Sequence, residues 1–279
     1  MKNFRTFLSK NLPSSIIHPM KRIYYIFYGF YLYVYGMIKG RRSWIQQIEF
    51  NEHKTSSKSD LEVYFDNYKE GPGIWKWRHY FDIYERHFKK FRGTPVRIVE
   101  IGIYSGGSLK MWREYFGQEC IVYGIDIEDA CKVYENDNVH ILIGDQSDRN
   151  FWQTFRNEVG LVDIVIDDGG HLPLMQLVTL EETLNHIKPG GVYLCEDITG
   201  RFNPFHSYVS GLSRSLHDTM YRDENCSSKQ QICPNPFQKI VNSIHLYPFV
   251  LVIEMNLNLV NTFSSPKRGT QWQPFFKAK

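Results

Sequence analysis

The residues best suited to chemistry in this 279-residue chain stand at the end of an apolar run, in the stretch IDDGGH (166–171). Two adjacent carboxylates, Asp167 and Asp168, follow Val162–Ile166 without a spacer, and His171 comes three residues after the second acid. Adjacent acids raise each other's pKa, so solvent, backbone donors or a cation must compensate them. The stretch therefore indicates either a catalytic site or a helix cap at Asp168 with an ordinary first-turn contact from His171.

Short apolar runs alternate with amphipathic stretches from Val96 onward, which predicts the elements that position these acids. Strands that are apolar almost throughout are typical of a parallel sheet covered on both faces. The last two runs, in SIHLYPFVLVIEMN (243–256), have no helix between them, which favours an antiparallel finish. We therefore predict an α/β fold: a doubly wound, mostly parallel sheet of seven strands with an antiparallel C-terminal strand pair. The expected strands include 96–101, 120–126, 139–144, 162–166 and 192–196, and the expected helices 75–91, 106–116, 149–159 and 172–187.

A second acid pair, Glu196 and Asp197, ends the fifth expected strand. In a doubly wound sheet the fourth and fifth strands are neighbours about 4.8 Å apart, and their carboxyl ends meet at the ligand-binding crevice. Asp167 and Asp168 are therefore expected beside the second pair. A carboxylate-rich set is what Mg²⁺ prefers, and no group of Cys or His suggests zinc. We predict a site for Mg²⁺ (or Mn²⁺), and we interpret the histidines other than His171 as structural or exposed.

The first expected strand runs into a glycine-rich turn, EIGIYSGGS (100–108), that opens the following helix. Glycines let the backbone approach a ligand, and the helix start offers free N–H groups. Asp126 closes the second strand, where an acid can bind both ribose hydroxyls, and Asp145 follows the third strand, where it would border an adenine. The turn lacks GxGxxG and begins with an acid, which suits the amino group of S-adenosylmethionine better than the diphosphate of NAD. The residues expected to bind this cofactor are Glu100, Gly102, Tyr104, Ser108, Asp126, Asp145, Gln146 and Asp167. The alternatives are an NAD-dependent oxidoreductase or plain turn residues.

The N-terminal segment differs from the rest of the chain in charge. The net charge of +3 includes eight Lys or Arg and no acid before Ile48, so the remainder is net acidic and no nucleic-acid partner is indicated. As a helix, the half-aromatic stretch IYYIFYGFYLYVYGMI (23–38) would span about 24 Å, short of a roughly 30 Å hydrocarbon core. Its flanking cations predict peripheral contact of residues 1–48 with an anionic membrane. Packing on the protein's own core or on a second copy in a homo-oligomer is the alternative.

The polar stretch HKTSSKSD (53–60) predicts a domain boundary. Five cysteines form no CxxC pair, which favours reduced thiols and a cytoplasmic protein, membrane-associated if the N-terminal helix binds lipid. A loop disulfide between Cys226 and Cys233 is the alternative for that pair. The expected ranges are 1–60 for the N-terminal extension and 61–279 for the main domain, with a helical lead-in (61–95) and a core (96–279).

In order and spacing these motifs resemble the class I S-adenosylmethionine-dependent methyltransferases. Within that group the chain resembles the metal-dependent sugar O-methyltransferases that act on macrolide antibiotics, of the mycinamicin and macrocin type. The resemblance runs from about Gly71 to Trp272. It is carried by WRHYFDIYERHF, VEIGIYSGGSLKMWREYF, YGIDI, GDQSD, VDIVIDDGGH, the ED of LCEDI, SIHLYPFVLVIE and RGTQW.

The resemblance implies a Rossmann-like methyltransferase fold and specific roles for the acids. In that family the residues matching Asp168, Glu196 and Asp197 coordinate the metal, and the residue matching His171 is the base, so His171 and Asp168 are the expected catalytic residues. The family usually has Ser where this chain has Gly170, a departure that should loosen the loop without removing a ligand.

We therefore expect an enzyme: an S-adenosylmethionine- and Mg²⁺-dependent O-methyltransferase acting on a sugar hydroxyl of a glycan or glycoconjugate. A divalent ion that chelates two neighbouring hydroxyls orients such an acceptor and lowers its pKa. One alternative is a catechol-like diol as acceptor, since two adjacent phenolic oxygens chelate equally well. The other is a non-catalytic, methyltransferase-like scaffold.

Overall fold

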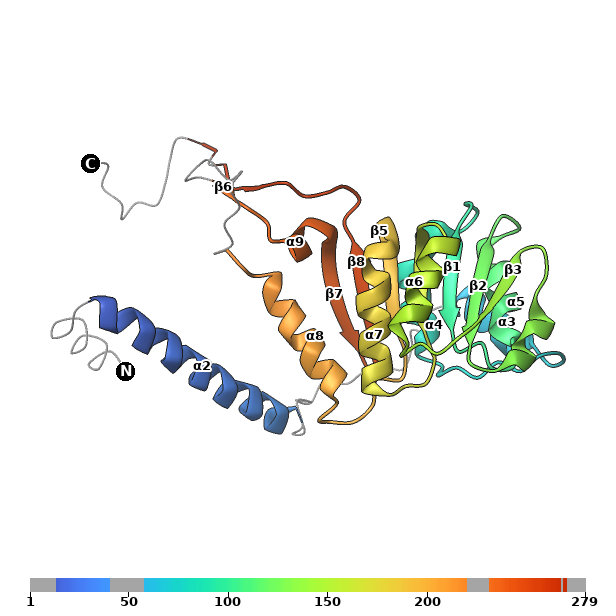
Figure 1. The fold of residues 1–279 in the computed structure, drawn as a ribbon, viewed down its shortest axis with the longest axis horizontal. Coiled ribbons are helices and arrows are strands. Elements are labelled where there is room, and N and C mark those ends of the chain that lie inside the picture. The colour runs from blue at the N-terminus through green and yellow to red at the C-terminus, as the bar shows by residue number, and fades with distance from the viewer. Residues whose placement is uncertain (1–13, 41–57, 220–230, 267, 270–279) are drawn as a thin grey trace. The chain divides into compact units, whose positions relative to one another are not determined.

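The computed structural model divides the chain into two compact units, which are described separately (Figure 1). The units are Met1–Ser56 and Ser57–Lys279. The structure describes residues 14–40, 58–219, 231–266 and 268–269.

The first unit contains one described helix, α2 (Ser14–Lys39), which includes the predicted aromatic stretch. Tyrosines three and four residues apart share a helix face, and here they stack. The ring centroids lie 5.7 Å apart for Tyr24 and Tyr28, and 6.1 Å apart for Tyr31 and Tyr35. Among the described helices, none combines the length and the apolar character that a membrane crossing requires.

The second unit is built on a seven-stranded sheet in the order β3-β2-β1-β4-β5-β8-β7. β1 to β5 pair in parallel, and β8 pairs antiparallel with both β5 and β7. The predicted doubly wound sheet with an antiparallel C-terminal pair is confirmed. The strands are β1 (Arg97–Ile101), β2 (Ile121–Asp126), β3 (Val139–Ile143), β4 (Val162–Asp167), β5 (Ile187–Cys195), β7 (Val241–Tyr247) and β8 (Val250–Met255), with a separate pair of β6 (Gln231–Ile232) and β9 (Phe263–Ser264).

Helices cover both faces of the sheet (Figure 1). One face carries α3 (Asp60–Asn67), α4 (Tyr80–Phe88) and α5 (Gly107–Phe116); the other carries α6 (Arg149–Glu158), α7 (Pro173–Thr183), α8 (Pro204–Ser215) and α9 (Pro236–Ile240). Short 3₁₀ turns are η1 (Lys89–Phe91), η2 (Asp129–Tyr134) and η3 (Leu184–His186). Because successive strand residues face opposite sides, Ile98 packs in the first core and Val99 in the second. Each core holds a fully buried tryptophan, Trp112 or Trp152, whose replacement by alanine would cost about 3–5 kcal/mol.

The helix predicted over 75–91 begins only at Tyr80. Before it, residues 73–77 form no helix, and their burial alternates: Trp75 and Trp77 are exposed while Lys76 is buried. The helix predicted from the aromatic spacing is therefore wrong for residues 75–79, because the side chain of Lys76 turns inward to pair with acidic side chains.

The fifth strand begins at Ile187 rather than at residue 192, so the PGG sequence (189–191) between the expected helix and the expected strand lies inside β5. Gly190 allows this because it adopts φ +76°, and its N–H donates to the carbonyl of Asn256 at 2.9 Å. The pairing of β4 with β5 shifts register at this point, between Val162 and Ile164.

The cysteines are of two kinds. Cys120, Cys131 and Cys195 are free and buried, as predicted. Cys233 is disulfide-bonded, so the prediction of a reduced thiol is wrong there. Cys226 lies outside the described residues.

Candidate functional site

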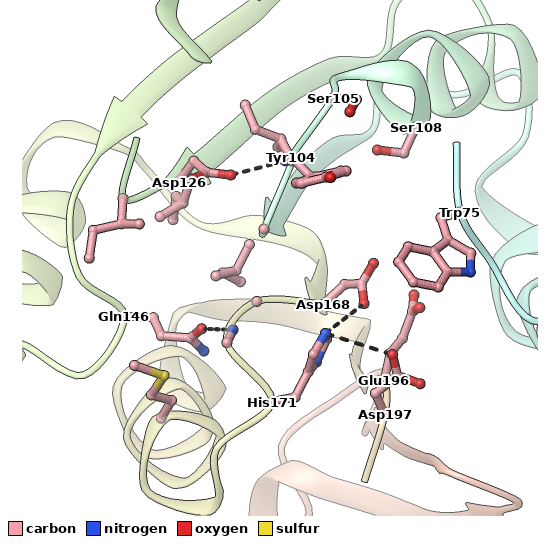
Figure 2. A pocket seen from close by; sticks show the side chains of 18 of the residues that line it. Trp75, Tyr104, Ser105, Ser108, Asp126, Gln146, Asp168, His171, Glu196 and Asp197 are labelled. Atoms are coloured by element: carbon pink, nitrogen blue, oxygen red, sulfur yellow. Dashed lines mark hydrogen bonds and ion pairs between the residues drawn. The ribbon is translucent and has the colours of Figure 1, made fainter. Parts of the chain in front are cut away.

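A cavity of about 710 Å³ opens at the carboxyl ends of β1 to β5 (Figure 2). A crevice forms there because strand order reverses at β1, so the loops after neighbouring strands diverge. Most of the predicted site residues line this cavity: Gly102, Tyr104, Ser108, Asp126, Asp145, Gln146, Asp168, His171, Glu196 and Asp197.

Glu100 and Asp167 are predicted cofactor contacts that do not line the cavity, and both side chains are buried. The pleat of β4 turns Asp167 into the second core, where Gln146 Nε2 donates to it at 3.0 Å and Tyr193 Oη at 3.3 Å. Burial raises the pKa of Asp167 to about 6, against the lowering effect of these donors. Glu100 accepts a 2.8 Å hydrogen bond from Ser108 Oγ. Both acids thus support the cavity wall from behind.

Gly102 brings the first loop against the acidic loop. It adopts φ +81°, and a Cβ there would stand 2.2 Å from the carbonyl oxygen of Asp168. The two loops are also joined directly, because Asp168 N–H donates to the carbonyl of Ile101 at 3.1 Å. A side chain at position 102 would therefore separate the glycine-rich turn from the acids.

At one end of the cavity, Asp126 holds the glycine-rich turn (Figure 2). Its Oδ2 accepts from Tyr104 N–H at 3.0 Å, and its Oδ1 accepts from Glu128 N–H at 3.1 Å. A carboxylate has about four acceptor positions, so both oxygens can still accept from a diol. Asp145 similarly fixes its own turn by accepting from Ser147 N–H and Oγ, both at 2.7 Å.

At the other end, the acids gather around a buried ammonium group, that of Lys76. Its Nζ lies 2.5 Å from Asp168 Oδ2, 3.1 and 3.2 Å from the two oxygens of Glu196, and 3.8 Å from Glu100 Oε1. The Lys76 side chain is only 3% exposed. Burial by itself lowers the pKa of Lys76, but the charges of Asp168, Glu196 and Glu100 outweigh it and raise that pKa. The ammonium group therefore stays protonated and compensates the predicted repulsion.

Aromatic side chains in α4 and just before it donate hydrogen bonds to the second acid pair, Glu196 and Asp197. Tyr84 Oη donates to Glu196 Oε1 at 2.6 Å, and Asp197 Oδ1 accepts from Tyr80 Oη at 2.7 Å and Trp77 Nε1 at 3.0 Å. Burial and the charge of Asp168 raise the pKa of Glu196, against the effect of Lys76 and Tyr84. Both oxygens of Glu196 thus have partners, while Asp197 keeps one oxygen free of these bonds.

His171 stands over the acids, with Nε2 3.7 Å from Asp197 Oδ2 and 4.0 Å from Asp168 Oδ1 (Figure 2). Its side chain is 41% exposed, so it reaches both the cavity and solvent. His171, Asp197 and Tyr104 have left-handed φ values of 55°, 53° and 47°; in the described residues only Phe249 shares this among non-glycines. Such conformations cost of order 1–3 kcal/mol each and concentrate at functional sites.

The donor atoms fit an oxygen-preferring divalent cation. Asp168, His171 and Asp197 each offer a ligand atom, and these atoms all lie within 4.8 Å of one another. Asp168 Oδ1 and Asp197 Oδ2 are the oxygens not engaged by Lys76, Tyr80 or Trp77. The predicted coordination by Glu196 stays a prediction, since both of its oxygens face Lys76.

Lys76 and Trp77 are the site residues that sequence reasoning missed. Both stand in WKWRHYF, where the aromatic spacing suggested a helix packed on the sheet. The available signal was a single lysine between two tryptophans after the GPG break at 71–73, a pattern that also suits an extended strap. Tyr80 and Tyr84, both from α4, pack in the first core of the sheet, and their hydroxyl groups also reach Asp197 and Glu196.

No protein-family model matches the chain. Among curated proteins, it is 32% identical over 224 residues to demethylmacrocin O-methyltransferase of Streptomyces fradiae, covering 73% of this chain and 55% of that protein. It is 30% identical over 205 residues to 8-demethyl-8-alpha-L-rhamnosyl tetracenomycin-C 2'-O-methyltransferase of Streptomyces olivaceus, covering 68% and 53%. The chain thus spans about half the length of the curated relatives it matches.

A solved structure of similar fold is the MycE methyltransferase from the mycinamycin biosynthetic pathway in complex with Mg and SAH. Its TM-score is 0.59 at 27% identity, over 72% of this chain and 55% of that one. A second MycE complex, with Mg, SAH and mycinamycin VI, gives 0.59 at 26% identity over 72% and 54%. The resemblance to class I S-adenosylmethionine-dependent methyltransferases of the macrocin and mycinamicin type is confirmed in both sequence and fold.

Proposed function

We propose that this protein is an S-adenosylmethionine- and Mg²⁺-dependent O-methyltransferase that acts on a sugar hydroxyl of a glycan or glycoconjugate. One observation carries the proposal: a single cavity holds the glycine-rich turn with Asp126 at one end and Asp168, His171 and Asp197 at the other. The names of the matched relatives, which are O-methyltransferases of macrolide- and tetracenomycin-linked sugars, support the same chemistry.

The methyl donor, S-adenosylmethionine, occupies the part of the cavity at the carboxyl ends of β1 and β2. Asp126 accepts hydrogen bonds from the ribose hydroxyls, while Asp145 and Gln146 border the adenine and Tyr104 covers it from the exposed side. Ser108 stands at the first turn of α5, whose N–H groups favour a carboxylate. The reactive methyl group is thereby directed toward the acids.

Asp168 and Asp197 would hold the divalent cation through the oxygens that Lys76, Tyr80 and Trp77 leave free, and Glu196 would join them through a remaining acceptor position of its carboxylate. When bound, such an ion lowers the pKa of an acceptor hydroxyl and orients two neighbouring oxygens. Lys76, Tyr80 and Tyr84 keep these carboxylates in place before the ion arrives, so little rearrangement is needed on binding.

His171 is the general base. Its Nε2 takes the proton of the acceptor hydroxyl as the oxygen forms a bond to the donor's methyl carbon and the sulfur–carbon bond breaks, leaving neutral S-adenosylhomocysteine. Asp197 and Asp168, both about 4 Å from Nε2, stabilise the imidazolium that results. Because the ring is partly exposed, the proton then leaves to solvent.

The acceptor approaches from the rim of the cavity. Trp75 is 89% exposed and lines the cavity, so it offers a flat apolar surface to the C–H face of a sugar ring (Figure 2). Trp77 stands beside it and is fixed by its bond to Asp197. An exposed ring that adjoins a cation site suits a polar, ring-shaped acceptor with adjacent hydroxyls.

Calorimetry and an acceptor screen test this function. The full chain is titrated with S-adenosylmethionine and with NAD, and a panel of glycosides and catechols is screened for transfer of a labelled methyl group. The expected result is binding of the first cofactor alone, and transfer to a sugar that stops with EDTA. Tight binding of NAD alone, transfer only to catechols, or turnover that EDTA leaves unchanged would contradict the proposal.

We also propose that α2 makes a peripheral contact with anionic membranes. Its aromatic stretch is flanked by cations, and a helix of this kind lies in the headgroup region rather than across the bilayer. The full chain should float with vesicles containing phosphatidylserine and not with phosphatidylcholine alone. Phe27→Asp should abolish flotation, whereas Lys110→Glu, on the exposed surface of the second unit, should not. Equal flotation of both variants would refute the contact, and self-association without flotation would assign α2 to a homo-oligomer.

A further inference from the structure

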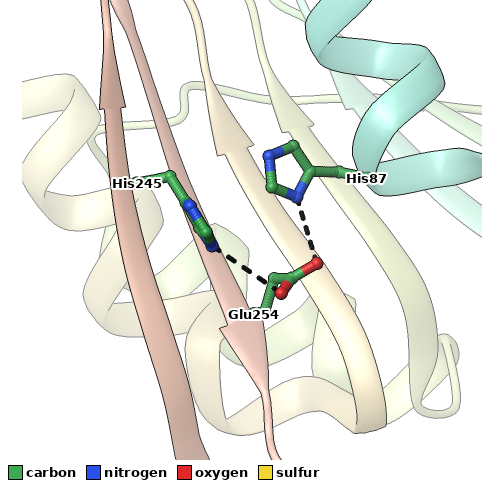
Figure 3. Close-up of side chains that lie close together, drawn as sticks. All are labelled: His87, His245 and Glu254. Carbon is green, nitrogen blue, oxygen red and sulfur yellow. Dashed lines mark hydrogen bonds and ion pairs between the residues drawn. The ribbon is translucent and has the colours of Figure 1, made fainter.

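A second group of potential metal ligands lies on the α4 side of the sheet edge. His87 comes from α4, His245 from β7 and Glu254 from β8, so three elements far apart in sequence supply one group (Figure 3). Val250 and Val252 of β8 pack in the core under α4, and the strand alternation places Glu254 on that same face. The topology of the antiparallel pair therefore creates this cluster.

The ligand atoms converge on a common point. Glu254 Oε1 lies 3.0 Å from His87 Nδ1, and Glu254 Oε2 lies 3.7 Å from His245 Nε2. All the ligand atoms lie within 4.8 Å of one another, and the two imidazole centroids are also 4.8 Å apart. Two imidazoles and one carboxylate form a donor set that zinc binds in proteins, whereas Mg²⁺ prefers oxygen alone.

The groups around the cluster complete a metal site. Tyr247 Oη lies 2.9 Å from His87 Nε2, so that nitrogen can keep its proton while Nδ1 binds a metal. Ser243 Oγ lies 2.9 Å from His245 Nε2 and 3.4 Å from Glu254 Oε2. A hydroxyl therefore stands where a fourth ligand would.

The cluster is accessible to an ion from one side, and among the described residues its carboxylate is paired with only one lysine. The His87 side chain is 3% exposed and fixed, whereas that of His245 is 36% exposed, so the cluster is open on one side. Lys90 Nζ lies 3.7 Å from Glu254 Oε1, but this lysine is half-exposed and can turn to solvent. A metal ion can therefore replace Lys90 as the counter-charge of Glu254.

The cluster is separate from the acidic cavity. Glu254 pairs with Val192 on β5, four residues before Glu196, which at about 3.3 Å per residue is some 13 Å along the strand. We propose that His87, His245 and Glu254 bind Zn²⁺, with Ser243 or water as the fourth ligand. The ion clamps the last turn of α4 onto the β7–β8 edge, and α4 is the helix whose Tyr80 and Tyr84 hold the acids.

Zinc titration in excess Mg²⁺ tests this site, because Mg²⁺ competes for the oxygen-rich cavity and not for imidazoles. The full chain is stripped with a chelator, and bound zinc is counted after dialysis while the Tm is followed. We expect one tightly bound Zn²⁺ per chain, a Tm raised by a few degrees, and visible d–d bands when Co²⁺ replaces Zn²⁺.

Three variants locate the ion. His245→Ala and Glu254→Gln should bind Zn²⁺ at least about tenfold more weakly, and the second keeps its shape if the first fails to fold. His140→Ala, a partly buried histidine of edge strand β3, and Asp168→Asn should bind like the unaltered chain. The proposal is overturned if the unaltered chain binds no zinc in excess Mg²⁺, if His245→Ala and Glu254→Gln bind it equally well, or if Asp168→Asn loses it.

Discussion

The two candidate metal sites of the second unit share one helix, α4, and differ in how they balance charge. In the acidic cavity, Asp168, Glu196 and Glu100 surround the buried ammonium of Lys76, and Asp197 stands beside them. The cluster of His87, His245 and Glu254 has one carboxylate, two imidazoles and a half-exposed lysine at its rim. Tyrosines of α4 contact the first region, and His87 at the end of the same helix contacts the second.

The difference shows how burial selects the compensating group. A carboxylate removed from water costs several kcal/mol unless a counter-charge and hydrogen bonds accompany it, so the deep acids require a cation from the chain itself. Near the surface, water and mobile side chains serve the same purpose, and the ligands can remain neutral imidazoles. The carboxylate oxygens of the first region therefore suit Mg²⁺, and the two imidazole nitrogens of the second suit Zn²⁺.

Removing the internal cation should have the largest effect. Lys76→Met keeps the side-chain volume but leaves two buried carboxylates and the partly buried Asp168 without their counter-charge. The free energy of unfolding should therefore fall by about 3–5 kcal/mol in urea without divalent ions. Lys89→Met, which loses only a surface pair with Glu85, should cost less than about 1 kcal/mol. Equal losses for both variants would show that Lys76 is not the counter-ion.

The same variant has a defined pH dependence. A carboxyl whose pKa is raised in the folded state, such as Glu196, binds more protons folded than unfolded, so stability falls as the pH rises above its ordinary value of 4.5. Without Lys76 this pKa rises further, and the deficit of Lys76→Met should grow from about pH 5 to about pH 8. A deficit that shrinks over this range would reverse the assigned sign.

Removing the proposed general base should lower the rate without weakening donor binding. His171→Gln should lower kcat for the sugar acceptor by about 100- to 10,000-fold, because the hydroxyl proton loses its acceptor. Calorimetry should give an unchanged affinity for S-adenosylmethionine. His140→Gln, far from the acids on β3, is the matched control. A large loss of donor affinity in His171→Gln would mean that the residue shapes the cavity rather than moves a proton.

Weakening the donor end should give an intermediate effect. Asp126→Asn replaces a charged acceptor of two ribose hydroxyls, which should raise the Kd for S-adenosylmethionine about 10- to 100-fold. Asp137→Asn, in an exposed turn before β3, should leave that Kd unchanged. If Asp126→Asn lowers the Tm but not the affinity, the residue serves only to hold the Tyr104 turn.

The fold could be predicted from the sequence because apolar runs and helical stretches alternate over most of the second unit. The features that local sequence patterns did not predict depend on contacts with residues distant in the sequence. Gly190 continues strand β5 because its N–H donates to the carbonyl of Asn256, which is distant in the sequence. Residues 73–77 form no helix because Lys76 meets acids about 90 to 120 residues away.

The candidate site was predictable where its residues end strands, since the carboxyl ends of parallel strands must meet. Asp168, Glu196 and Asp197 are of this kind. The face of the sheet on which a side chain lies was harder to predict. Asp167 is the last residue of β4 and Glu100 the last but one of β1, but the pleat turns both side chains inward. His87 and His245 gave no signal, because their meeting depends on where α4 crosses the antiparallel pair.

The smallest expected effects come from removing one tyrosine hydroxyl at each region, and they test whether the two regions act independently. Tyr247→Phe removes the partner of His87 Nε2 and should weaken Zn²⁺ binding roughly 10-fold, with no change in the Mg²⁺ dependence of methyl transfer. Tyr84→Phe removes the partner of Glu196 Oε1 and should raise the Mg²⁺ concentration needed for half-maximal rate, with no change in zinc affinity. Parallel zinc titrations and Mg²⁺-dependent rates measure both. If each variant shifts both ions alike, α4 couples the two regions and they act as one site rather than as two.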